Sequence, residues 1–268
     1  MSGAPKTEST DGNIADENTT DPRLYAEATR VVDSASGGIV VVGVVHDHPA
    51  SVYRARRVVE SVTPDVVAVE LPQLAVPAFE RLPTTAGAAD ATSDGSPANE
   101  MSAALAAAGE ARTAGIDGID GGFARDLATS LGRERASFRT VRSVAESLVG
   151  VTREALACGV AGRRDRAPDP GRLPRGGTDY GTTADDPPEA QVADERRHRS
   201  RSRSLLRAIE RPHADRILDA ARERAMVRRL AALADEGDIV AVVGFEHLDA
   251  VADGLEAELC RDEKRSRT

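Results

Sequence analysis

The apolar positions of this chain gather in two runs that have nearly the same form. The first run covers Ile39 to Val45 and is interrupted only by Gly43, and the second covers Ile239 to Val243. Runs that are apolar at every position are typical of strands buried on both faces, as in a parallel sheet. We therefore expect an α/β domain in which both runs are central strands.

Between the runs, the spacing of apolar residues alternates between helical and extended patterns. Helical spacing over 51–62 is ended by Thr63-Pro64-Asp65, and a second apolar strand follows over 66–71. A β-α-β unit of this kind places the ends of both strands on one edge of the sheet. Further patterns predict a short strand over 115–120 and helices over 100–113, from 123, over 138–160, over 212–237 and over 248–260.

These elements predict one α/β domain with a mixed or mostly parallel sheet flanked by helices. We expect residues 1–22 to form a disordered tail, 23–260 to form the domain, and 261–268 to form a charged tail. A flexible insertion is expected at about 161–190, because Arg, Asp, Pro and Gly dominate there.

Composition narrows the classes of function. The formal net charge of −9 argues against a generic nucleic-acid binder, and the basic block 196–203 lacks interleaved aromatic residues, so we interpret it as the solvated face of a helix. Arginine almost replaces lysine, as in proteins of salt-loving archaea. The sequence has neither a signal peptide nor an apolar stretch of about 18 residues, so we expect a soluble cytoplasmic protein without a membrane span. The oligomeric state cannot be inferred.

Ionisable residues follow the predicted strands at the points where the strands end. Gly43-x-x-His46 and Gly244-x-x-His247 close the two runs, Glu70 closes the strand between them, and Asp117 or Asp120 follows the third strand. Two imidazoles with one or two carboxylates can hold a divalent metal such as Zn, Mn, Co or Fe, and such a metal activates water. The alternative is that the histidines are incidental and the carboxylates cap helices or pair with arginines.

Four motifs, in order, resemble the TraB/PrgY family over residues 38 to 258. They are Val42 to His46, Pro64 to Leu71, Arg222 to Met226, and Val242 to His247. The family is related to the Tiki and GumN-like proteins and, more remotely, to the erythromycin-esterase (EreA) and ChaN-like group. The resemblance implies the EreA/ChaN-like α/β architecture with the site at the paired Gly-x-x-His motifs.

By this resemblance, His46, His247 and Glu70 are candidate metal ligands, with Glu70 also a candidate base. Glu223 and Arg224 match the family's Glu-Arg pair, in which the arginine orients substrate or the pair supports the sheet edge. The first hypothesis is a metal-dependent hydrolase of peptides or another amide or ester, as described for Tiki proteins. The second is a non-catalytic module that binds a peptide or small ligand, as PrgY blocks a peptide pheromone.

The chain also departs from the family pattern. The segment from Asp120 to Asp126 is looser than the family's Asp-Arg-Asp segment, which weakens a role for Asp120, and residues 161–200 match nothing in the family. His48 lies two residues beyond His46, and the sequence does not decide which of the two would bind a metal. Many relatives have C-terminal membrane helices, which this sequence lacks.

Overall fold

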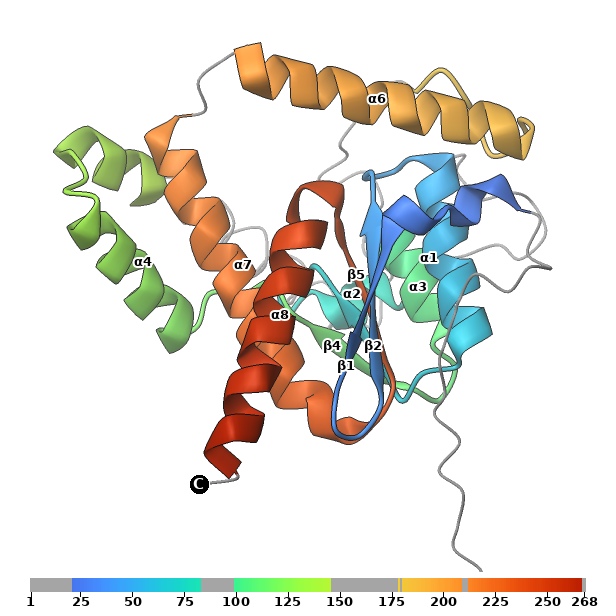
Figure 1. Ribbon diagram of the computed structural model, residues 1–268. Helices are drawn as coiled ribbons and strands as arrows, with labels where there is room; N and C mark the ends of the chain where they lie inside the picture. The colour runs from blue at the N-terminus through green and yellow to red at the C-terminus, as the bar shows by residue number, and fades with distance from the viewer. Residues whose placement is uncertain (1–20, 83–98, 146–177, 179, 209–211, 267–268) are drawn as a thin grey trace, which may run out of the picture.

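The computed structural model describes residues 21–82, 99–145, 178, 180–208 and 212–266, and it shows a five-stranded sheet between helices (Figure 1). The strands are β1 (Thr29–Asp33), β2 (Gly38–Val44), β3 (Val66–Val69), β4 (Arg112–Gly115) and β5 (Ile239–Gly244). Their order in the sheet is β1-β2-β5-β3-β4. β1 pairs with β2 antiparallel, and the other pairs are parallel. The predicted α/β class with a mostly parallel, mixed sheet is confirmed.

The two sequence runs are neighbouring central strands. β2 and β5 pair in parallel from Ile39 opposite Ile239 to Val44 opposite Gly244, and β5 also pairs with β3. Every residue of β5 is buried, as expected for a strand that is covered on both faces. The segments that follow β2, β5 and β3 therefore emerge side by side at one edge of the sheet.

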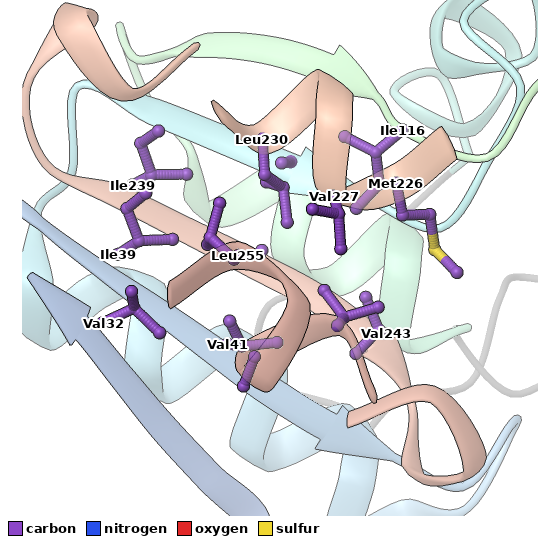
Figure 2. Close-up of a cluster of buried hydrophobic side chains, with 14 of the residues drawn as sticks. Val32, Ile39, Val41, Ile116, Met226, Val227, Leu230, Ile239, Val243 and Leu255 are labelled. Carbon is purple, nitrogen blue, oxygen red and sulfur yellow. The ribbon is translucent and has the colours of Figure 1, made fainter. Parts of the chain in front are cut away.

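Two helical layers cover the faces of the sheet. One face packs against α7 (His213–Leu233) and α8 (Phe245–Ser266), where Met226, Leu230 and Leu255 belong to one apolar cluster with Ile39 and Ile239 (Figure 2). The other face packs against α1 (Pro49–Val62), α2 (Val76–Phe79) and α3 (Glu100–Ala107). α4 (Gly121–Arg133) and a helix over 138–145 pack with α7 in a separate apolar cluster.

Helix α6 (Pro188–Ala208) crosses the edge at which the parallel strands end (Figure 1). A buried ion pair fixes it there: Arg54 of α1 donates to both carboxylate oxygens of Glu195, at 3.1 and 2.5 Å, and both side chains are fully buried. Ser51 donates to the same carboxylate and accepts the backbone N–H of Val45. Among the described helices, none is long and apolar enough to cross a membrane.

Several boundaries differ from the sequence prediction, among them the end of the second strand, which is Val69 instead of residue 71. The third strand ends at Gly115 instead of covering 115–120, because residues 112–115 are those that align with β3, while Asp120 caps α4. α3 is shorter than expected, and α8 begins at Phe245 instead of about residue 248, which places His247 in its first turn. Most of the predicted N-terminal tail and of the insertion at 161–190 lies outside the described residues.

Candidate functional site

Two histidines follow β2, His46 of the first Gly-x-x-His segment and His48 two residues later, and they lie in different surroundings. After Val44 the chain turns at Asp47, whose φ of 58° is in the left-handed region that aspartate tolerates. His48 then caps α1, because its Nδ1 accepts the N–H of Ala50 at 3.2 Å and Pro49 occupies the first helical turn. His48 is fully buried, and its Nε2 lies 3.6 Å from Asp194. Its position is that of a structural cap.

His46, in contrast, is about half exposed, with 52% of its side chain accessible. Its Nδ1 lies 2.7 Å from Oε1 of Glu100, and the other oxygen of Glu100 accepts the N–H of Asp47. Glu100 is completely buried in the first turn of α3, where the helix dipole favours a negative charge. The hydrogen bond that the imidazolium donates to Glu100 raises the pKa of His46 to about 9 against the effect of burial, with further contributions from the charges of Glu100, Glu70 and Glu246. His46 is therefore protonated at neutral pH.

The second Gly-x-x-His segment ends in the first turn of α8, and His247 is 2% exposed. Its Nδ1 lies 2.9 Å from Oε1 of Glu223, and its Nε2 lies 3.6 Å from Oε1 of Glu70. Although burial lowers the pKa of His247, the hydrogen bond to Glu223 and the charge of Glu70 raise it overall. Both histidines of the repeated motif thus have Nδ1 held by a glutamate.

Glu70 lies at the centre of the edge, directly after β3. One of its oxygens accepts the backbone N–H of Gly244 at 2.7 Å, and the other accepts NH2 of Arg222 at 2.7 Å. Arg222 also donates from Nε and NH2 to Asp117, which follows β4. Burial raises the pKa of Glu70, while His247 and Arg222 oppose that rise. The group is a connected set of opposite charges that links β3, β4, β5 and α7.

The structure thus brings four of the predicted site residues to one edge: His46, Glu70, Glu223 and His247. Arg224 lies elsewhere: its NH2 donates to Ser130 at 2.8 Å, its Nε is 3.8 Å from Asp126, and both partners are on α4. Asp120 is also away from Glu70, because it caps α4 and pairs with Arg229. Of the two aspartates that the sequence offered, Asp117 and not Asp120 lies at the edge with Glu70.

Sequence reasoning missed two residues of this edge, Arg222 and Glu100. Arg222 could have been identified from helical spacing, because it lies four residues before the apolar Met226. That spacing places both on the face of α7 that packs against the sheet. Glu100 had none, since it follows no strand and is separated from His46 by more than fifty residues.

The contacts at the edge bear on the predicted metal. Among the described residues there is no group of three or more His, Cys, Asp and Glu side chains that could hold a metal ion. Glu70 already accepts hydrogen bonds from Arg222 and Gly244, so a cation bound to it would lie beside the positive guanidinium of Arg222 and be repelled by it. The residues as they stand do not fit a site with His46, His247 and Glu70 as ligands, and we assign no chemical step to a metal.

No protein-family model, curated protein or solved structure matches this chain.

Proposed function

We propose that this protein is a TraB/PrgY-like hydrolase that cleaves an amide or ester bond, with peptides as the expected substrate class. The observation that supports this most is the repeated arrangement at the strand edge. Two imidazoles follow neighbouring parallel strands, and each is held at Nδ1 by a glutamate from a helix. Strand ends of this kind are where α/β sheets bind ligands, and imidazoles oriented by carboxylates are common acid–base groups.

His46 has the properties of the general acid. Its pKa of about 9 keeps it protonated at neutral pH, and its side chain is half exposed, so that a substrate can reach it. Glu100 fixes the ring through Nδ1, which leaves Nε2–H to donate. In this role Nε2 gives its proton to the nitrogen or oxygen atom that leaves the carbonyl carbon.

Glu70 is the proposed general base. Burial raises its pKa, which makes its carboxylate a stronger proton acceptor than an exposed one. A water oxygen attacks the carbonyl carbon while Glu70 accepts the proton of that water, and the bond to the leaving group breaks as His46 protonates it. The products are a carboxylic acid and an amine or alcohol, and proton exchange with solvent restores both side chains.

Arg222 and His247 act as positioning residues in this proposal. Arg222 holds Glu70 and Asp117 together, and His247 places a ring nitrogen 3.6 Å from Glu70. Both favour the ionised form of Glu70 and oppose the effect of burial. Their replacement should change the pH dependence of the rate as well as its size.

The test is a screen of the purified protein against a mixed peptide library and a panel of simple esters, with products identified by mass spectrometry. Wild type should form products, His46→Gln and Glu70→Gln should lose about two to four orders of magnitude in rate, and Arg201→Gln, on the exposed surface of α6, should retain full activity. Equal rates in wild type and His46→Gln would contradict the proposal. A ligand that raises the thermal stability of wild type without being converted would favour the binding module instead.

A further inference from the structure

One face of α6 carries a set of arginines that the proposed hydrolysis does not use. A cavity of about 350 Å³ is lined by three arginines and two serines: Arg196, Arg199, Ser200, Arg203 and Ser204. These positions are three or four residues apart, so they share one helical face. The volume lies near the lower limit of ligand pockets, which measure roughly 300–1,000 Å³.

The positive charge of this arginine face is only weakly balanced by neighbouring protein groups. Arg196 lies 3.9 Å from the exposed Glu27, and within the described residues no carboxylate is paired with Arg199 or Arg203. Arginines three and four residues apart on a helix repel one another. An anion in the cavity would offset this repulsion.

Arg199 supplies a second observation. Its guanidinium lies 3.4 Å over the ring of Phe245 and donates from NH1 to the hydroxyl of Tyr25. These two aromatic residues hold the guanidinium beside the cavity that Arg199 lines. Its Nε is buried and has no hydrogen-bond partner in the part of the chain that the structure describes. The protein thus fixes this guanidinium without using all of its donors.

We propose that the arginine face of α6 binds a phosphate group, either as the free anion or as part of a small phosphorylated molecule. Guanidinium groups bind phosphate oxygens in pairs of parallel hydrogen bonds, and the two serine hydroxyls can donate to the remaining oxygens. The formal net charge of −9 repels anions at long range, so the attraction for a phosphate has to come from these arginines at short range. Binding here is independent of the proposed hydrolysis.

The experiment is calorimetric titration of wild type with inorganic phosphate and with glycerol phosphate, at an ionic strength held constant with chloride. Wild type should show saturable binding. The double variant Arg199→Gln/Arg203→Gln should bind about tenfold or more weakly, since it removes two charge-assisted contacts. Arg201→Gln is the matched control, because it removes the same charge from α6 outside the cavity. Tighter binding of glycerol phosphate would assign the site to a phosphorylated molecule, and the reverse order to the free anion.

Because Arg199 also contacts Phe245 and Tyr25, its replacement could affect folding. The single variant Arg203→Gln, which lacks those contacts, should show a smaller but measurable loss of affinity with unchanged circular dichroism. The proposal is overturned if wild type shows no saturable binding, if Arg201→Gln loses as much affinity as Arg203→Gln, or if only polyanions such as duplex DNA bind.

Discussion

The hydrogen bond between Glu100 and His46 makes a quantitative prediction that does not depend on the substrate. In Glu100→Gln the buried carboxylate is replaced by a neutral amide of nearly the same shape. The pKa of His46, about 9 in the wild type, should then fall toward its ordinary value of 6.5. Glu70 and Glu246 remain in the variant and should keep it slightly above that value.

The same change has a consequence for stability. A rise in the pKa of His46 from 6.5 to about 9 corresponds to about 3 kcal/mol in the free energy of unfolding if the whole rise arises on folding. Because half of the His46 side chain is exposed, solvent screening reduces this to about 1–2 kcal/mol. The folded pKa is raised, so this stability is fully present below pH 6.5 and is lost as the pH rises through about 9.

Two measurements check this reasoning. An NMR titration of the imidazole protons gives the pKa of His46 in each protein, and denaturant unfolding near pH 6 and near pH 10 gives the stability difference. We expect Glu100→Gln to be destabilised relative to wild type more near pH 6 than near pH 10. Any weakening of the hydrogen bond from the N–H of Asp47 affects both pH values equally and cancels in this difference. A wild-type pKa near 6.5, or a pKa near 9 retained in the variant, would refute the role of Glu100.

Three further predictions follow from particular contacts. Replacement of the buried Arg54 by methionine leaves Glu195 without its partner and should lower the free energy of unfolding by about 3–5 kcal/mol in denaturant titrations, whereas an effect below about 1 kcal/mol would contradict the ion pair. A Cβ at Gly43 would lie 2.7 Å from the ring of Phe245, so Gly43→Ala should cost about 1–3 kcal/mol by thermal unfolding, and a neutral result would show that the ring moves freely. Elemental analysis after dialysis should find no stoichiometric Zn, Mn, Co or Fe in wild type, since Arg222 occupies Glu70; near-stoichiometric metal that is lost in His46→Ala would support the three-ligand metal site instead.

The central part of the fold could be predicted because its signals are local. The apolar runs that precede His46 and His247 indicated buried parallel strands, and parallel strands that end together bring their following residues to one edge. The position of β5 between β2 and β3 was not predictable, because apolar strands carry no information about their neighbours. It is this order that places His247 between His46 and Glu70.

The partners of the site residues were harder to predict than the residues themselves. Glu100 reaches His46 only because α3 packs beside α1 on the same face of the sheet, a tertiary arrangement without a sequence motif. The choice between Arg222 and Arg224 depended on the rotation of α7, which is set by Met226 and Leu230 packing against the sheet. The resemblance pointed to Glu223 and Arg224, and the packing of α7 places Glu223 and Arg222 at the edge instead of Arg224.

Hydrolysis at the strand edge can be tested by incubating wild type and His46→Gln with the peptide library in water labelled with heavy oxygen. Wild type should form cleaved peptides whose new carboxyl groups contain the labelled oxygen, and His46→Gln should form almost none. Absence of cleavage by folded wild-type protein, or labelled products formed equally by both proteins, would contradict it.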